Sequence, residues 1–195
     1  MKNICVYLGA NFGNKGNFKK YVETLGKEIS EQGFTLIYGG SSLGMMGLLA
    51  NTVKKNGGAV IGIITRNLID KEIPLSNLDE LIVVDSMQER KKLMQLKSDS
   101  FVVMPGGLGT LEEAMDTWNA IKIGEINKPI AFFNKENYFD GLFNFMSSCA
   151  DSGFLKLEHL TIPIVSDSVI DIMSQLTLNN KSIESSDTAF ETYTI

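Results

Sequence analysis

A glycine-rich turn between two apolar segments is the part of the sequence best suited to binding a small anion. The apolar run 101–104 predicts a buried strand, and Pro105 ends it because proline has no N–H for a sheet ladder. Three glycines follow: Gly106, Gly107 and Gly109. Glycine allows backbone angles closed to other residues and lets a ligand approach the main chain. A helix is expected next with Thr110 as its N-cap, and its unpaired N–H groups favour a phosphate.

A carboxylate stands close to this turn. Glu113 lies three residues beyond Thr110, where it could stabilise a developing positive charge or activate a water molecule. The same Thr-x-x-Glu spacing also fits a capping box, in which Glu113 would bond back to the start of its own helix. These two roles compete, because a side chain folded back on the cap cannot serve a substrate.

Arg90 is a candidate partner for an anion. It is expected in the first turn of a helix that follows the strand 80–84, with Ser86 and Glu89 at capping-box spacing. A cation in that position opposes the helix dipole, so an anionic partner explains it better than helix stability does. The alternative is a solvated helix face, because residues 89–92 form a charge run.

The elements that position these residues alternate along the chain. Strands are expected at 3–8, 34–38, 60–64, 80–84, 101–104, 130–133 and 162–165. Helical stretches between them predict a single-domain α/β protein with a Rossmann-like three-layer fold and a mainly parallel sheet of about seven strands. The turns at Gly9, Gly39 and Pro105 each follow a strand and should therefore share the ligand-binding rim of the sheet. We assign residues 1–178 to this domain and expect 179–195 to be a loose polar tail.

Composition excludes several classes of protein. The net charge of −5 does not predict a nucleic-acid surface, and no apolar run approaches the length of a membrane span. Cys5 and Cys149 are expected to be reduced thiols, which fits a cytoplasmic protein. One histidine, His159, and the lack of a Cys/His cluster argue against a zinc site or a Ser-His-Asp triad, and no metal or cofactor is expected.

The nine residues from Pro105 to Glu113 match the pattern PGGxGTxxE letter for letter. The chain therefore resembles the Lonely guy (LOG) family, often mislabelled as lysine decarboxylases. That family hydrolyses the N-glycosidic bond of nucleoside 5′-monophosphates, typically AMP or cytokinin ribotides, and releases the base and ribose 5-phosphate. Residues 39–47 are similar to the family's GGGxxGLMG turn, with Ser41 at its third glycine and Met45 at its leucine. Packing through small residues explains that turn equally well.

The resemblance assigns roles to individual residues. It implies that Arg90 and Glu113 are catalytic, with Glu112 as a neighbour that could support them. The implied substrate-binding residues are Glu72, Arg90, Lys91, Gly106, Gly107, Gly109, Thr110, Glu113 and Asn119. Glu72 stands 18 positions before Arg90, as a substrate-binding glutamate does in the family. The sequence fits a solvated loop glutamate nearly as well.

The chain departs from the family at positions that bear on the base. Asn119 aligns with a substrate-contacting threonine, Ala120 with the tryptophan of a WAQLG segment and Lys122 with its glutamine. Losing the ring and gaining a cation makes the region more open and polar, so we expect AMP to fit better than an isoprenoid-decorated adenine nucleotide.

Two further expectations concern function and assembly. The alternative to a hydrolase is a non-catalytic nucleotide or molybdenum-cofactor carrier, which would not need the pair of Arg90 and Glu113. A literal lysine decarboxylase is disfavoured because no pyridoxal-binding context is evident.

A homodimer is expected, since family members are typically dimers. The helix after the fifth strand also carries more apolar residues than one inner stripe needs: Ala114, Met115, Trp118, Ile121 and Ile123.

Overall fold

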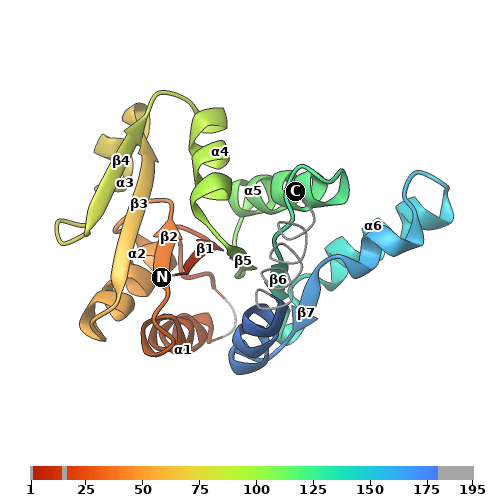
Figure 1. Ribbon diagram of the computed structural model, residues 1–195, viewed down its shortest axis with the longest axis horizontal. Coiled ribbons are helices and arrows are strands. Elements are labelled where there is room, and N and C mark those ends of the chain that lie inside the picture. The colour runs from red at the N-terminus through yellow and green to blue at the C-terminus, as the bar shows by residue number, and fades with distance from the viewer. Residues whose placement is uncertain (1, 15–16, 180–195) are drawn as a thin grey trace, which may run out of the picture.

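The computed structural model describes residues 2–14 and 17–179. Seven strands form one sheet in which every neighbouring pair is parallel, in the order β4-β3-β2-β1-β5-β6-β7 (Figure 1). The strands are β1 (Asn3–Tyr7), β2 (Thr35–Tyr38), β3 (Ala59–Thr65), β4 (Glu80–Val84), β5 (Ser100–Val103), β6 (Ile130–Phe133) and β7 (Ile164–Ser166). The predicted α/β class and strand number are confirmed, with strand ends shifted by one or two residues.

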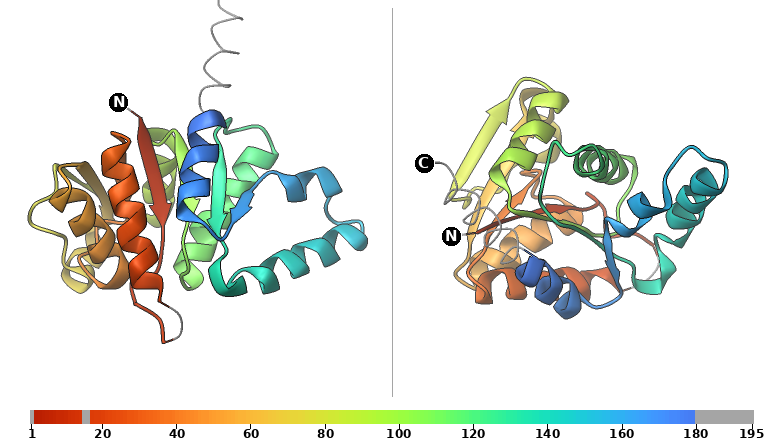
Figure 2. Two further views of the ribbon diagram at one scale, coloured as in Figure 1. Left: turned by 90° about the horizontal axis from the view of Figure 1, so that it is seen from below. Right: turned by 45° about the vertical axis from the view of Figure 1, so that its right-hand side comes forward.

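Helices cover both faces of the sheet, so the predicted three layers are confirmed. The α-helices are α1 (Phe18–Glu31), α2 (Gly44–Lys55), α3 (Ile69–Glu72), α4 (Met87–Lys97), α5 (Leu108–Lys122) and α6 (Asp140–Asp151), and residues 169–179 are also helical. Short 3-10 turns occur at Arg66–Leu68, Lys135–Asn137 and Leu157–Thr161. Figure 2 shows α1 and residues 169–179 below the sheet and α4 and α5 above it. No helix among the residues that the structure describes has the length and apolar character needed to cross a membrane.

Two apolar clusters hold these layers together. One cluster joins α1, α2 and residues 169–179 to one sheet face, and includes Leu25, Leu49 and Met173. The other joins α4 and α5 to the opposite face, and includes Met94 and Trp118. Apolar side chains project from both faces of the sheet into these clusters. The central strands are therefore buried on both sides, as their continuous apolar runs predict.

The order of strands reverses at β1. This strand pairs with β2 on one side and with β5 on the other. The chain leaves β1 toward α1 on one face and leaves β5 toward α5 on the other. Diverging connections of this kind open a crevice at the carboxyl ends of the two strands, where α/β proteins bind their ligands.

The helix α6 packs against the second cluster along one side only. Its inner stripe is formed by Phe139, Leu142, Phe143 and Met146, which contact that cluster, although no residue within α6 itself is fully buried. Phe139, just before the helix, is buried, and the ring of Phe143 lies 5.4 Å from that of Phe132. The rest of α6 extends away from the sheet (Figure 1). Of the tail predicted at 179–195, residues 180–195 lie outside the described part of the chain.

Candidate functional site

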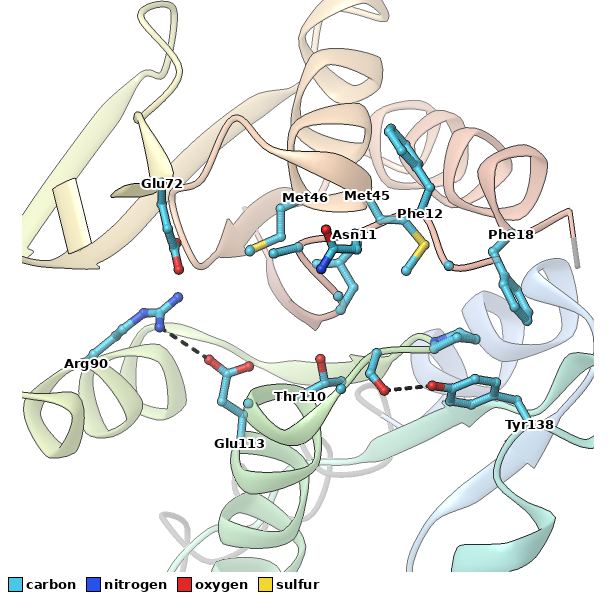
Figure 3. A pocket seen from close by; sticks show the side chains of 18 residues that line it. Asn11, Phe12, Phe18, Met45, Met46, Glu72, Arg90, Thr110, Glu113 and Tyr138 are labelled. Atoms are coloured by element: carbon cyan, nitrogen blue, oxygen red, sulfur yellow. Dashed lines mark hydrogen bonds and ion pairs between the residues drawn. The ribbon is translucent and has the colours of Figure 1, made fainter. Parts of the chain in front are cut away.

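A cleft of about 470 Å³ lies at the carboxyl ends of β1 and β5. The turns at Gly9 and Pro105 line the cleft, and the turn at Gly39 accepts a hydrogen bond from Arg90, which also lines it. The three turns therefore meet at one rim of the sheet, as predicted. The side chains converge on it from both layers of helices (Figure 3). The residues that line the cleft are Leu8, Gly9, Ala10, Asn11, Phe12, Gly13, Phe18, Met45, Met46, Glu72, Arg90, Pro105, Gly106, Gly107, Gly109, Thr110, Glu113 and Tyr138.

The glycine turn after β5 leads directly into the helix α5. The prediction that Thr110 is the N-cap is wrong. Gly107 is the N-cap, and no side chain of the described residues caps the helix. Thr110 is instead the third residue of α5 and is buried against Gly106. The capping-box alternative for Glu113 is therefore wrong as well, and among the described residues no side chain accepts a hydrogen bond at the start of α5.

The glycines of this turn are not there for unusual backbone angles. None of Gly106, Gly107 and Gly109 has a positive φ, so the first reason predicted for them is wrong. A Cβ on Gly106 would collide with the side chain of Thr110. A Cβ on Gly107 or Gly109 would meet no atom within 4 Å. Those two positions present bare backbone to open space at the positive end of α5, where an anion can approach closely.

Glu113 occupies the floor of the cleft. It lies one turn into α5 and is only 9% exposed. Burial raises the pKa of Glu113 to about 7, while the positive charge of Arg90 opposes that rise. The carboxylate Oε1 lies 3.8 Å from Nη1 of Arg90 (Figure 3). A carboxyl group with this pKa can exchange a proton near neutral pH.

Arg90 is fixed by backbone carbonyl groups rather than by the carboxylate alone. Its Nε donates to the carbonyl of Ile63 at 2.9 Å, and its Nη2 donates to that of Gly39 at 3.1 Å. The predicted cap of α4 is confirmed, because the hydroxyl of Ser86 accepts from the N–H of Glu89 at 3.1 Å. Arg90 is buried, and its guanidinium is held at one wall of the cleft.

Glu72 faces Arg90 and Glu113 across the cleft (Figure 3). Its Oε2 is buried and has no hydrogen-bond partner among the described residues. Burial raises the pKa of Glu72, and the charge of Arg90 opposes this. The structure thus brings together three charged residues that were expected at the site, and leaves one carboxylate oxygen without a donor.

Other predicted residues lie outside the cleft of this chain. Lys91 pairs on the surface between α4 and α5 with Glu112 at 3.0 Å and Asp116 at 3.5 Å. Asn119 is exposed on α5 and does not line the cleft. Ala120 and Lys122, which were expected to shape the base pocket, do not line it either. The structural basis expected for a preference between bases is therefore missing within one chain.

Several cleft residues were not predicted. Tyr138 donates its hydroxyl to the carbonyl of Gly106 at 2.7 Å, and its ring packs edge-on against Phe18 at 5.7 Å. Met45 and Met46, at the start of α2, line the opposite wall. Tyr138 follows β6, whose carboxyl end lies on the same rim as that of β5. The rim argument could therefore have included it.

The arrangement suits a reaction at a sugar phosphate. An open turn at a helix N-terminus can hold a phosphate, a buried carboxylate stands one helical turn away, and a fixed guanidinium stands beside it. A carboxylate so placed can stabilise a cation that develops on a sugar and can activate water. Among residues 2–14 and 17–179, no three His, Cys, Asp or Glu side chains gather as they would to hold a metal ion.

Known proteins match this chain in sequence. The family described as "Possible lysine decarboxylase" matches residues 46–176. The cytokinin riboside 5′-monophosphate phosphoribohydrolase LOG5 of Arabidopsis thaliana is 38% identical over 155 residues, which cover 80% of this chain and 68% of that protein. The phosphoribohydrolase LOG1 of the same plant is 34% identical over 175 residues, which cover 90% of this chain and 82% of that protein.

Solved structures match it in fold. The molybdenum cofactor carrier protein of Chlamydomonas reinhardtii superposes with a TM-score of 0.70 at 21% identity, over 91% of this chain and 97% of that one. The molybdenum cofactor binding protein of Rippkaea orientalis gives 0.68 at 22% identity, over 91% and 96%. At these identities the likeness concerns the fold alone.

Proposed function

Because this chain belongs to the Lonely guy (LOG) family, we propose that it is a nucleoside 5′-monophosphate phosphoribohydrolase. It hydrolyses the N-glycosidic bond and releases a free base and ribose 5-phosphate. The observation that carries the proposal is the position of Glu113: a buried carboxylate beside Arg90, one turn along the helix whose open N-terminus lines the same cleft.

The 5′-phosphate occupies the turn after β5. The bare backbone at Gly107 and Gly109 lets its oxygens approach the first N–H groups of α5, which no side chain caps. Gly106 and Thr110 pack against each other and fix the shape of the turn. Anchoring the phosphate there places the ribose over Glu113, so binding energy is used to orient the reacting carbon.

Glu113 and Arg90 act on the bond itself. As the bond from C1′ to the base nitrogen breaks, its electron pair leaves with the base and positive charge develops on the ribose. Ionised Glu113 stabilises that charge and takes a proton from the water whose oxygen attacks C1′. Arg90, held by two carbonyl groups, favours the electron-rich leaving base.

Glu72, Lys91 and Asn119 are the other side chains that the family resemblance assigns to substrate binding. Glu72 accepts a hydrogen bond from the substrate, which satisfies the buried Oε2. The roles that the family resemblance implies for Lys91 and Asn119 stay predictions, because both lie outside the cleft of one chain. A molybdenum-cofactor carrier remains the second candidate, although the likeness that favours it is one of fold. A carrier has no need of the pair of Arg90 and Glu113.

We also propose that the enzyme is a cytoplasmic homodimer that binds neither nucleic acid nor membrane. The free thiols of Cys5 and Cys149 fit a reducing compartment. Of the five apolar residues of α5 expected at the dimer surface, Ala114 and Trp118 are buried within the chain's own core, which leaves Met115, Ile121 and Ile123 partly or well exposed. Exposed apolar side chains on and after α6 offer a second candidate surface: Phe145, Phe154 and Leu157.

Sedimentation at micromolar concentration tests the dimer. Wild-type protein should sediment as a dimer, and Phe145→Glu should sediment as a monomer without losing its fold, because Phe145 is 65% exposed. A wild-type monomer would refute the homodimer.

Product analysis tests the activity. Incubation with AMP and with isopentenyladenosine monophosphate should release free base and ribose 5-phosphate, both detectable by chromatography. The ratio of kcat/KM for the two nucleotides identifies the preferred base, for which we expected AMP. If both nucleotides bind and neither is cleaved, the carrier function replaces the hydrolase.

A further inference from the structure

The turn after β2 touches both charged residues that face Glu113. At its start, the carbonyl of Gly39 accepts a hydrogen bond from Nη2 of Arg90 at 3.1 Å. Two residues later, the turn is bonded to the segment that carries Glu72. One short stretch of backbone therefore sets the positions of a cation and a carboxylate that come from distant parts of the chain.

Ser41 makes the central contact with that segment. Its side chain is completely buried, and its hydroxyl donates to the carbonyl of Glu72 at 3.1 Å. The same hydroxyl accepts from the N–H of Leu43 at 3.1 Å, which fixes its direction. The neighbouring N–H of Ser42 donates to the carbonyls of Glu72 and Ile73 at 3.2 and 3.1 Å. An isolated antiparallel bridge between Ser41 and Pro74 completes the connection.

The segment held in this way is strained. Ile73 has φ 44° and ψ 91°, a left-handed conformation that is uncommon for a β-branched residue. Its side chain is 60% exposed, so burial there offsets little of the cost. Such strain persists only where surrounding contacts hold it, and residues in this state cluster at functional sites. Here the surrounding contacts are those of Ser41, Ser42 and Pro74.

The side chain of Glu72 extends from the residue next to this strained position. Glu72 immediately precedes Ile73 and points into the cleft toward Arg90 (Figure 3). Its Oε2 is buried without a donor among the described residues, which is costly unless a ligand supplies one. A carboxylate oxygen accepts from hydroxyl and N–H groups, and a ribose bound over Glu113 would bring hydroxyl groups into the cleft that Glu72 also lines.

We propose that Ser41 is a positioning residue, which holds the Glu72 carboxylate in the cleft so that it accepts a hydrogen bond from a ribose hydroxyl of the bound nucleotide. This inference rests on the proposed function for the identity of the ligand. The way that Ser41 holds Glu72 does not depend on the ligand, so the two parts can fail separately.

The first test needs no ligand. The carboxyl carbon of Glu72, assigned with Glu72→Gln, is titrated by ¹³C NMR in wild-type protein and in Ser41→Ala. Burial raises the pKa of Glu72 in the wild type, against the charge of Arg90 and with ionised Glu113 also facing the cleft. In Ser41→Ala the freed carboxylate should turn toward solvent, and its pKa should fall toward the ordinary value of 4.5. An unchanged pKa would overturn the proposal whatever the enzyme catalyses.

A matched control separates this effect from the loss of any buried hydroxyl. Ser98 is also buried, and its hydroxyl donates to the carbonyl of Met94 at 2.8 Å, away from the cleft lining. Ser98→Ala should lower stability about as much as Ser41→Ala and leave the titration of Glu72 unchanged. If the alanine variant of Ser41 does not fold, Ser41→Cys fills the site with a slightly larger side chain, loses the strong donor and gives the same readouts.

The second test uses a mutant cycle in AMP hydrolysis. Ser41→Ala should raise KM about threefold to tenfold with little change in kcat, which is the range for one lost hydrogen bond. In a Glu72→Gln background the same change should have no further effect on KM, because the group that Ser41 positions is already altered. Additive effects would mean a general structural role and would overturn the proposal. If the wild type releases no base, the hydrolase fails and the titration still decides the role of Ser41.

Discussion

The turns after β2 and after β5 are both rich in glycine and both lead into a helix, yet their glycines face different surroundings. In the turn after β2, the protein itself excludes a side chain. A Cβ on Gly47 would collide with the backbone of Ser42, and one on Gly44, which has φ 52°, would collide with that of Ala10. These glycines are needed for the chain to fold.

The turn after β5 is different because two of its glycines meet nothing. Gly107 and Gly109 have ordinary backbone angles and open space where a side chain would stand. No atom of the described chain requires glycine at either position. We propose that a bound molecule approaches the backbone at these two positions, so the comparison separates glycines that the fold itself requires from glycines that leave the backbone accessible to a ligand.

The largest expected effect separates chemistry from binding at the open turn. Glu113→Gln should lower kcat for base release about 10³-fold, because the amide lacks the charge that stabilises the transition state. Affinity for ribose 5-phosphate should change little, since the turn that holds the phosphate is untouched. Steady-state kinetics and calorimetric titration measure the two quantities. A Glu113→Gln enzyme with wild-type kcat would remove Glu113 from the mechanism.

The next effect tests the difference between the two turns directly. Gly109→Ala should leave the free energy of unfolding unchanged or raise it by up to about 1 kcal/mol, because alanine favours a helix. Its methyl group should nonetheless weaken ribose 5-phosphate binding at least about tenfold by blocking the approach to the backbone.

Gly47→Ala, in α2 after the turn that follows β2, is the matched control. It should lower the free energy of unfolding by roughly 3 kcal/mol or more, because a backbone collision must be relieved. Denaturant unfolding and calorimetry on both variants complete the comparison. If Gly109→Ala binds normally, the open space after β5 does not hold the phosphate.

The pH dependence sharpens the role of the carboxylate beside the open turn. Burial raises the pKa of Glu113 to about 7, and in the proposed mechanism the ionised form is the one that acts. We therefore expect kcat/KM to rise about tenfold per pH unit below 7 and to level off above it. A profile without an inflection between pH 6 and 8 would contradict this assignment.

The same raised pKa has a consequence for stability. A carboxyl group with a folded pKa above its ordinary 4.5 binds more protons in the folded state between those values. Its contribution to stability is therefore present below pH 4.5 and is lost as the pH rises to about 7. Relative to Glu113→Gln, the wild type should lose stability over that interval, as measured by denaturant unfolding.

Sequence patterns predicted the fold and the meeting of Arg90 and Glu113 in one cleft, for physical reasons. Apolar runs between helical stretches specify a parallel sheet, and sheet topology alone brings together the residues at the carboxyl ends of strands. Arg90 and Glu113 could be placed in this way because both stand in the first turns of helices that follow strands. The capped start of α4 was also predictable, since Ser86 and Glu89 are local in sequence.

What could not be predicted depends on contacts between distant segments. The capping box at Thr110 looked the same as the one at Ser86, but α5 begins three residues earlier than the spacing suggested. The reason for glycine at positions 107 and 109 requires knowing what surrounds them. The apolar residues of α5 also fit either an interface or a core, and Trp118 proved to pack on Phe132 at 5.9 Å.

Tyr138 adds a final difference between the two turns. It reaches the open turn from the far side of β6, and its hydroxyl donates to the carbonyl of Gly106 at 2.7 Å. Its ring is 45% exposed and rests against Phe18 and Phe139. The turn after β2 is tied to a distant segment by the hydroxyl of Ser41, which belongs to the turn itself, whereas the first residue of the open turn accepts a hydrogen bond from a side chain outside it.

The smallest expected effect tests that bond. Tyr138→Phe keeps the ring and its packing and removes only the hydroxyl, so the free energy of unfolding should change by less than about 1 kcal/mol at this partly exposed position. KM for AMP should rise about threefold to fivefold, because the carbonyl of Gly106 no longer has a donor that holds the turn in its binding conformation. The value of kcat should stay within about twofold, since Glu113 and Arg90 are not contacted by Tyr138. A fall in kcat with unchanged KM would mean that Tyr138 acts on the reacting atoms rather than on the turn.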